Sequence, residues 1–300
     1  MARTCLRPAR AWAVGLAALV VLAVVAGPPA LAWLADVWTG RRPLDAVAFR
    51  VGPVAVHWYG ILIAFSFIPG WMLAQPERAR IGLSVDELLD AAALGIPLGL
   101  AGARAGFVIQ NLDYFAEHPG DIFRTWMGGL SIHGVLAGVG FAILVFSRRR
   151  RVSAAALADL AAPSVLLGQA IGRWGNFFNH EVVGYPTSRP WGFYVPPELR
   201  PPGWAGAAYF HPAFLYESVW NALGVAALVA YRRRRERRSG EVAALYLIIY
   251  SAGRFLVEFW RIGEPLALGL TLAQWVSLGA AAAGAAWRYA ARQRARVVVE

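Results

Sequence analysis

The sequence has little charge, one cysteine and no lysine, and these scarcities exclude several classes of protein. Only 16% of the 300 residues are charged, whereas 58% are hydrophobic and the mean hydropathy is +0.48. Soluble proteins carry about 25% charged residues. The composition therefore excludes an ordinary soluble domain and predicts an integral membrane protein. The single cysteine, Cys5, excludes an internal disulfide framework.

Other absences concern cofactors and partners. The sequence contains no glycine-rich phosphate loop, no cysteine–histidine metal spacing and no internal repeat, so we expect neither a cofactor nor a metal. The net charge of +11 is compatible with nucleic-acid binding, but the basic residues, all arginine, form short clusters between apolar runs. That placement is typical of membrane topology, through the excess of positive charge on cytoplasmic loops. We therefore expect no nucleic-acid partner.

Apolar runs alternate with polar breaks along the chain and predict an all-α, polytopic membrane fold. The arginine clusters at residues 148–151 and 232–238 fall on one side when the runs are alternated, which marks that side as cytoplasmic. We predict about eight crossings, an extra first one followed by about seven core transmembrane helices, with both chain ends inside. The runs are residues 54–74, 88–109, 128–146, 154–178, 212–231, 242–260 and 270–287.

A further apolar run, Ala11 to Trp33, precedes these seven and follows three arginines. It is either an extra transmembrane helix or a cleaved signal, and its length favours the helix, because signal cores run about 7 to 15 residues. The predicted domains are an N-terminal extension over residues 1–40 and a membrane-embedded domain over 41–290. The domain includes an outer loop at 179–210, and a cytoplasmic tail follows at 291–300.

Polar residues are concentrated in the stretch from Gly172 to Glu181, directly after an apolar run. An ionised group at the centre of a membrane helix costs roughly 2.5 to 3.5 kcal/mol, so such a stretch is a candidate functional site. Arg104 adds another guanidinium within an apolar run. Several arginines at one end of a bundle would suit a phosphate at the membrane surface, because guanidinium groups bind phosphate bidentately.

Two further polar features have a structural and a functional interpretation. His133 stands among glycines, which permit close helix packing, and it is either a structural histidine or a proton acceptor. Arg254 and Glu258 are spaced i, i+4, so they can form a local ion pair without any function. From the residues alone, the chain carries a membrane-embedded site for an anionic lipid, either catalytic or transporting.

Several ordered motifs run through the chain. They are residues 57–60, 102–104, 111–114, 128–134, 172–181, 186–187, 190–191, 211–212, 215–217, 253–254, 258–259 and 261. Together these motifs resemble the prolipoprotein diacylglyceryl transferase family, from about Leu44 to about Leu278. The resemblance implies transfer of the diacylglyceryl group of phosphatidylglycerol to the lipobox cysteine of a prolipoprotein signal peptide, with formation of a thioether and release of glycerol 1-phosphate.

The resemblance also implies the site residues. Arg173 and Arg254 would hold the phosphate, Glu258 would orient Arg254, and Tyr59 and Asn176 would donate hydrogen bonds to the headgroup. His133 would accept the thiol proton, with Arg261 acting near the thiol through its charge as the alternative. The full set is Tyr59, His133, Arg173, Asn176, Glu181, Gly184, Arg254, Glu258 and Arg261. No role follows for His57 or His180.

The resemblance also implies where the site lies, and two other functions would use a similar set of polar residues. The family's site lies on the outer side of the bacterial cytoplasmic membrane, which agrees with the topology derived from the arginine clusters. A lipid transporter or flippase would also contain intramembrane arginine and histidine, but it predicts polar residues throughout the membrane depth and paired repeats. An inactive, lipid-binding paralogue is the other alternative, and the presence of every expected charged residue argues against it.

Overall fold

The structure is a computed structural model that describes residues 27–125, 128–234 and 237–293. Most of the described chain is helical, in agreement with the predicted class. It divides into two compact units. The helical unit comprises Gly60–Trp174, Leu215–Phe259 and Gly263–Glu300, and the loop unit comprises Met1–Tyr59, Gly175–Phe214 and Trp260–Ile262. The predicted boundaries at residues 40 and 290 stay predictions.

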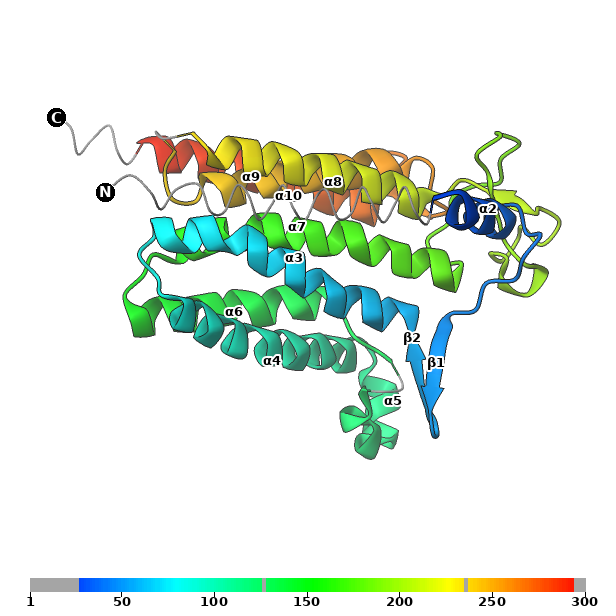
Figure 1. Ribbon diagram of the computed structural model, residues 1–300, viewed down its shortest axis with the longest axis horizontal. Helices are drawn as coiled ribbons and strands as arrows, with labels where there is room; N and C mark the ends of the chain where they lie inside the picture. Colours follow the sequence, from blue (N-terminus) through cyan, green and yellow to red (C-terminus); the bar gives the residue numbers. More distant parts are fainter. Residues whose placement is uncertain (1–26, 126–127, 235–236, 294–300) are drawn as a thin grey trace. The chain divides into compact units, whose positions relative to one another are not determined.

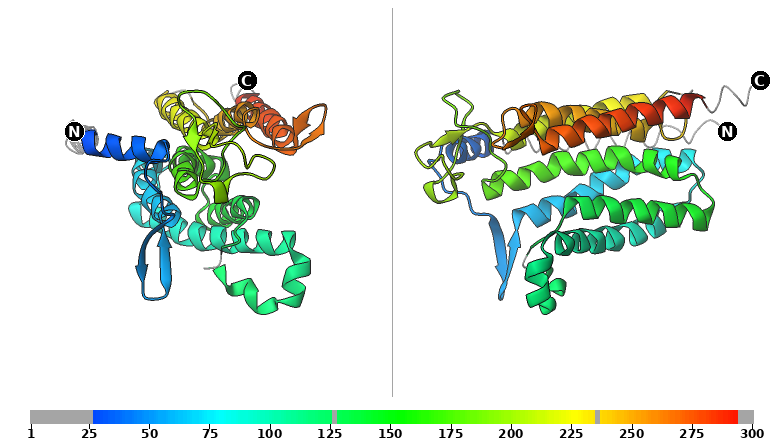
Figure 2. Two further views of the ribbon diagram at one scale, coloured as in Figure 1. Left: turned by 90° about the vertical axis from the view of Figure 1, so that its right-hand side faces the viewer. Right: turned by 180° about the vertical axis from the view of Figure 1, so that it is seen from behind.

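The helical unit contains long helices that lie roughly parallel or antiparallel to one another, along the horizontal direction of Figure 1. Each coincides with one of the predicted apolar runs to within a few residues. Figure 2 shows the same helices from two further sides. The helices are α3 (Trp58–Arg80), α4 (Val85–Gln110), α6 (Ile132–Arg150), α7 (Ala154–Asn179), α8 (Ala213–Arg232), α9 (Glu241–Glu258) and α10 (Leu272–Gln293). The short elements α5 (Leu112–Glu117) and η1 (Pro119–Phe123) follow α4, and strands β5 (Pro265–Ala267) and β6 (Leu270–Thr271) precede α10.

Four of these helices, α3, α4, α7 and α8, are long and apolar enough to cross a membrane. Many of their large apolar side chains are exposed, among them Phe65 and Ile68 of α3 and Leu100 of α4. An apolar surface of this kind is stable against lipid and not against water. The chain is therefore a multi-pass membrane protein. Helix α9 carries three charged residues, and the count of seven core helices stays a prediction.

Glycines bring α4 and α6 into backbone contact. A Cβ added to Gly102 would overlap with the carbonyl oxygen of Gly134, and one added to Gly138 would overlap with that of Leu98. Small residues allow helix backbones to approach this closely in membranes. The structure thus confirms the packing role predicted for the glycines that follow His133.

The loop unit is built around an aromatic core, and it contains strands that the all-α prediction missed. Its elements are α2 (Gly27–Trp38), β1 (Val47–Val51), β2 (Val54–His57), β3 (Phe193–Tyr194), η3 (Pro197–Leu199) and β4 (Tyr209–Phe210). Strand β1 pairs with β2, and β3 with β4, both antiparallel. Trp38 of α2 contacts the rings of Phe177, Phe193 and Phe214. Residues 11–26 of the predicted run from Ala11 to Trp33 lie outside the described residues.

Candidate active site

Arg173 forms an ion pair with Glu217 inside the helical unit. Arg173 comes from α7 and Glu217 from the first turn and a half of α8, and their side chains are 23% and 1% exposed. The neighbouring Ser218 donates to the carbonyl oxygen of Ala170 on α7 over 2.8 Å, so two successive residues of α8 hold the two helices together. A carboxylate that is almost fully buried needs a charged partner, and here Glu217 fixes the position of the Arg173 guanidinium.

Arg254 forms a second ion pair, with Glu258 one turn further along α9, as the i, i+4 spacing predicted. Their side chains are 17% and 7% exposed. The Oγ1 of Thr271 donates to the Oε1 of Glu258 over 2.9 Å. Glu258 is therefore held from both sides, and this arrangement restricts where the Arg254 side chain can lie.

Tyr250 connects the two pairs. Its hydroxyl hydrogen-bonds with Arg173 and lies within electrostatic range of Glu217 and Arg254. Two guanidinium groups, each with its own buried carboxylate, thus face one tyrosine between α7, α8 and α9. Preorganised cations of this kind stabilise negative charge at low cost, because they are already oriented and partly desolvated.

The loop unit brings together another part of the predicted set. The Nδ2 of Asn176 donates to the Oε2 of Glu181 over 3.3 Å, and the N–H of Glu181 donates to the carbonyl oxygen of Asn176 over 2.9 Å. Val182 follows with a φ of 57°, which is a real outlier for a β-branched residue. Strain of this size persists only where the surroundings enforce it, and the Val182 carbonyl accepts the N–H of Phe214.

Gly184 lies against the backbone of residues 260 and 261. It forms a β-bridge with Arg261, and its N–H donates to the carbonyl oxygen of His211 over 2.8 Å. An added Cβ would overlap with the carbonyl oxygen of Trp260. Glycine is required here because of the close approach, and Gly184 thereby fixes the backbone of Arg261.

Tyr59 packs on the start of the polar stretch. Its ring covers Gly175, where an added Cβ would overlap with the ring, and its side chain is 40% exposed. The preceding Trp58 stacks on Phe178 with ring centroids 5.0 Å apart. Three aromatic residues of the motifs therefore pack within the loop unit, and the Tyr59 ring rests against the helix turn that also carries Asn176.

His133 is the second residue of α6, and its side chain lies outside the described residues. The turn that carries it is anchored on α4, because the N–H of Ser131 donates to the carbonyl oxygen of Ala103 over 2.9 Å. In addition, the Nε2 of Gln110 donates to the Oγ of Ser131 over 2.7 Å. The role of His133 stays a prediction.

Arg104 does not present a free guanidinium. It donates hydrogen bonds to the backbone carbonyls of Asp121, Ile122, Gly128 and Gly129. It therefore holds η1 and residues 128–129 in place, and its charge is used structurally. The expectation that Arg104 adds to a phosphate site is corrected by these contacts.

His57 and His180, for which no role was predicted, both contribute to the packing of the loop unit. His57 ends β2 and pairs with Val47 of β1. His180 is buried, has a φ of 53° and stacks on Phe193 with ring centroids 5.3 Å apart. Burial lowers the pKa of the His180 imidazole, and the nearby Glu198 carboxylate opposes that shift. His180 is thus a neutral core residue of the loop unit near pH 7.

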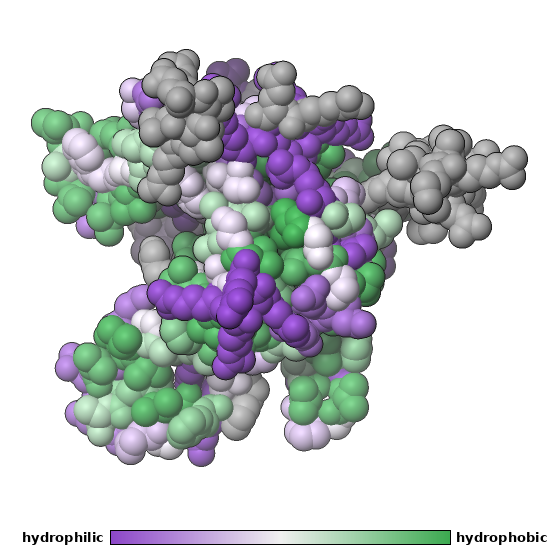
Figure 3. Space-filling model, turned by 90° about the vertical axis from the view of Figure 1, so that its left-hand side faces the viewer, coloured by the Kyte–Doolittle hydropathy of each residue, from purple (hydrophilic) through white to green (hydrophobic). Residues whose placement is uncertain are grey.

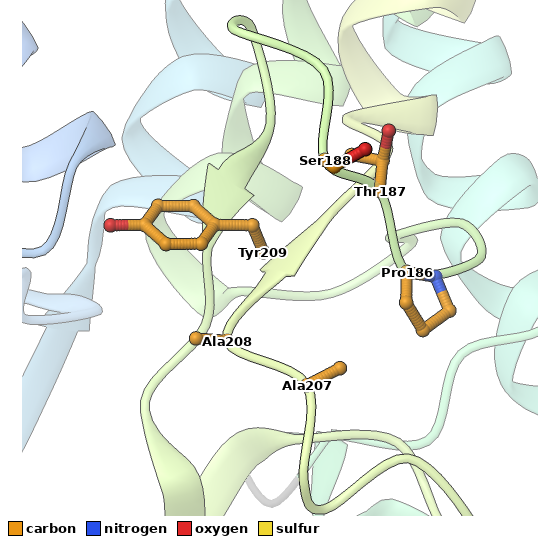
Figure 4. Close-up of a pocket in the computed structure, with 6 residues that line it drawn as sticks. All are labelled: Pro186, Thr187, Ser188, Ala207, Ala208 and Tyr209. Carbon is orange, nitrogen blue, oxygen red and sulfur yellow. The ribbon is translucent and has the colours of Figure 1, made fainter.

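A cavity of about 420 Å³ opens in the loop unit between residues 186–188 and 207–209 (Figure 4). It is lined by Pro186, Thr187, Ser188, Ala207, Ala208 and Tyr209. None of these residues belongs to the predicted set, and none carries a permanent charge. The cavity therefore shares no lining residue with the arginine–carboxylate pairs. Within the described residues, no three histidine, cysteine or acidic side chains gather as a metal site would require.

Sequence reasoning missed Glu217 and Tyr250. Glu217 stands in the apolar run 212–231, where any carboxylate is costly, and that cost was a sufficient signal to assign it to the site. Tyr250 gave no such signal, because tyrosines are common in membrane helices.

Together these features define a class of protein: a multi-pass helical membrane protein with two buried arginine–carboxylate pairs that suit an anionic ligand. The family model described as prolipoprotein diacylglyceryl transferase matches residues 46–289. The chain belongs to that family.

Curated relatives agree over most of the chain. A phosphatidylglycerol–prolipoprotein diacylglyceryl transferase of Fervidobacterium nodosum is 39% identical over 273 residues, which are 91% of this chain and 93% of the relative. One of Bacillus cereus is 43% identical over 238 residues, covering 79% and 88%. One of Acaryochloris marina is 40% identical over 245 residues, covering 80% and 89%.

Proposed function

We propose that this chain transfers the diacylglyceryl group of phosphatidylglycerol to the lipobox cysteine of a prolipoprotein signal peptide. The observation that carries the proposal is the pair of guanidinium groups, Arg173 and Arg254, each held by a buried carboxylate, in a chain of this family. The names of the curated relatives give the same donor lipid and the same class of acceptor.

The reaction is a substitution at the carbon of the diacylglyceryl group that bears the phosphate. The cysteine thiolate forms a carbon–sulfur bond, the carbon–oxygen bond to phosphate breaks, and glycerol 1-phosphate leaves with the electron pair. Negative charge grows on the phosphate oxygen as that bond breaks. Arg173 and Arg254 stabilise this charge, and they need no reorientation because Glu217 and Glu258 already hold them.

The thiol must lose its proton before or during the attack, because the thiolate is the nucleophile and a free cysteine has a pKa of about 8.5. In this proposal His133 accepts the proton, and its position at the start of α6 is anchored on α4 through Ser131. Arg261 is the alternative, lowering the thiol pKa through its charge. Tyr59, Asn176, Glu181 and Gly184 bind or position the lipid headgroup.

The proposal also includes a location. The pairs lie on α7 and α9 at the ends opposite the arginine clusters of residues 148–151 and 232–238. The positive charge marks the cytoplasmic side, so we place the chemistry at the outer face of the bacterial cytoplasmic membrane. The count of about seven core helices, and the extra helix or signal before them, belong to the same proposal.

The test uses the purified full chain in phosphatidylglycerol vesicles with a lipobox peptide, and mass spectrometry detects the diacylglyceryl adduct. We expect the adduct with the wild-type chain, and about a 100- to 10,000-fold slower reaction with His133→Gln, because a general base contributes about that much. Lipid binding should change little. His118→Gln, at a histidine stacked on Tyr114, is the matched control.

Two results would contradict the proposal. If the wild-type chain forms no adduct but moves labelled lipid across the vesicle membrane, it is a transporter. If His133→Gln forms the adduct at near wild-type rate, the transferase function holds and His133 is not the base.

A further inference from the structure

The hairpin of β5 and β6 ends in an apolar tip. Its strands pair through Ala267 and Leu270, and the two residues between these positions form the turn. Leu268, in the turn, is 88% exposed, and Leu266 on β5 is 66% exposed. Every residue from 265 to 270 is apolar or glycine. The tip therefore carries no charge and presents leucine side chains.

The backbone of the turn makes a leucine at its first position unusual. Leu268 has a φ of 52° and Gly269 a φ of 72°, and a two-residue turn with positive φ at both positions favours asparagine followed by glycine. Leucine rarely adopts positive φ, because its Cβ crowds the backbone. In water, asparagine would suit this position better, both in conformation and in solvation. Leucine is favoured here only in an apolar environment, which the described residues do not supply.

The hairpin is held on the first turn of α10 and on α9. The N–H of Thr271 donates to the Oε1 of Gln274 over 3.0 Å, and the Nε1 of Trp275 donates to the carbonyl oxygen of Ala267 over 3.2 Å. The Oγ1 of Thr271 also donates to Glu258 on α9. Figure 2 shows the hairpin, in orange, projecting sideways at the ends of the helices. The tip therefore points outwards from the side of the helical unit.

The apolar tip continues an exposed apolar surface of α10. Leu272 follows the hairpin directly and is 64% exposed, and Val276, one turn further along the same face, is 57% exposed. Helix α10 packs on α9, in the same helical unit as the four helices that are long and apolar enough to cross a membrane. Trp275 lies in the first turn of α10, and tryptophan prefers the level of the lipid headgroups. A hairpin that projects sideways at this level lies along the membrane surface.

We propose that the tip of the β5–β6 hairpin inserts among the lipid acyl chains next to the headgroups and anchors the start of α10 in that leaflet. Moving exposed leucines from water into lipid is favourable in proportion to their apolar area. Because the tip has no charge, it fits acyl chains and not phosphate headgroups. The opposite end of the helices differs, since Figure 3 faces it and shows strongly hydrophilic residues among hydrophobic ones. This anchor is independent of the transferase activity.

The test measures the depth of spin labels on the full chain in phosphatidylcholine vesicles. The one cysteine of the sequence is first replaced, by Cys5→Ser, and a nitroxide is attached to Leu268→Cys. Glu264→Cys is the matched control, because it is exposed just before the same hairpin but carries a charge in the wild-type chain. The label at position 268 should collide more often with oxygen, which concentrates among acyl chains, than with a water-soluble nickel complex. At position 264 the order should reverse, and added phosphatidylglycerol should change neither result.

Three results would overturn the proposal. Collisions with the nickel complex that are at least as frequent as those with oxygen at position 268 would place the tip in water. Poor access of both reagents, together with restricted motion of the label, would show that a protein surface such as a second copy of the chain covers the tip. Insertion that requires phosphatidylglycerol would indicate headgroup recognition instead. Leu266→Cys provides a second position on the same tip, and it decides if Leu268→Cys does not fold.

Discussion

Glu217 is the residue whose replacement most directly tests the proposed site. The substitution Glu217→Gln keeps the shape of the side chain but removes the negative charge that faces Arg173. Removing one partner of a buried ion pair costs about 3 to 5 kcal/mol. Because Arg173 keeps 23% of its side-chain exposure, water compensates part of this loss and about 3 kcal/mol is the appropriate figure.

The free energy of unfolding should fall by that amount, which the Tm reports. The rate has a separate cause: Arg173 is no longer held in position, and losing one preorganised donor lowers the rate by about 100- to 1,000-fold, so we expect kcat/KM to fall by about 100-fold. The assay is diacylglyceryl transfer to a lipobox peptide at several concentrations of phosphatidylglycerol, with the Tm measured on the same preparations. Ser218→Ala is the matched control, because it removes a neighbouring buried contact of α8 with α7 without changing any charge. Its kcat/KM should stay within about threefold of wild type.

A double-mutant cycle makes the prediction sharper. If Glu217 acts by holding Arg173, then Glu217→Gln should cost little more in a chain that already carries Arg173→Gln, because coupled residues are not additive. The reasoning fails if Glu217→Gln retains near wild-type kcat/KM at an unchanged Tm. It fails equally if the two losses simply add.

Two predictions concern the loop unit. In Gly184→Ala the added methyl group overlaps with the Trp260 carbonyl, so we expect at least a tenfold loss of transfer activity, about 1.4 kcal/mol. The control is Gly206→Ala, where nothing lies within 4 Å of the added Cβ, and its activity should match wild type. Equal activity of the two variants would contradict the role of the close approach. The pKa of His180 is lowered in the folded protein, so the unfolded chain binds this proton more readily than the folded chain does. The stabilisation that comes from keeping His180 neutral is therefore fully present above about pH 6.5, and it is lost as the pH falls towards the pKa of His180 in the folded protein. His180→Phe, which keeps the stacking on Phe193, should make the Tm flatter between about pH 7 and pH 5; an unchanged slope would count against this account.

Much of the fold and part of the site follow from the sequence. The apolar runs predict the helices because a membrane span must be long, apolar and helical. The pair Arg254–Glu258 was predictable because both residues lie on one helix face. By contrast, Arg173 and Glu217 are 44 residues apart, and their contact depends on how α8 packs on α7, which no local pattern encodes.

The contacts of Arg104, the need for glycine at position 184 and the short strands could not be predicted, because none of them leaves a recognisable local pattern in the sequence. The contacts of Arg104 are with backbone carbonyls, which every residue possesses, so the sequence does not indicate which ones it selects. The need for glycine at position 184 arises from the approach of residue 260. Strands β3 and β4 are only two residues long each, which is too short for an alternating pattern to be recognised.

The glycine contact between α4 and α6 also restricts how a lipid reaches the protein interior. Gly102 and Gly134 leave no side chains between the two helix backbones. A seam held by side chains opens when those side chains change rotamer, but a seam of backbone against backbone opens only if whole helices separate. We therefore expect a two-tailed lipid to enter along a different face, and the pair α4–α6 to move as one piece.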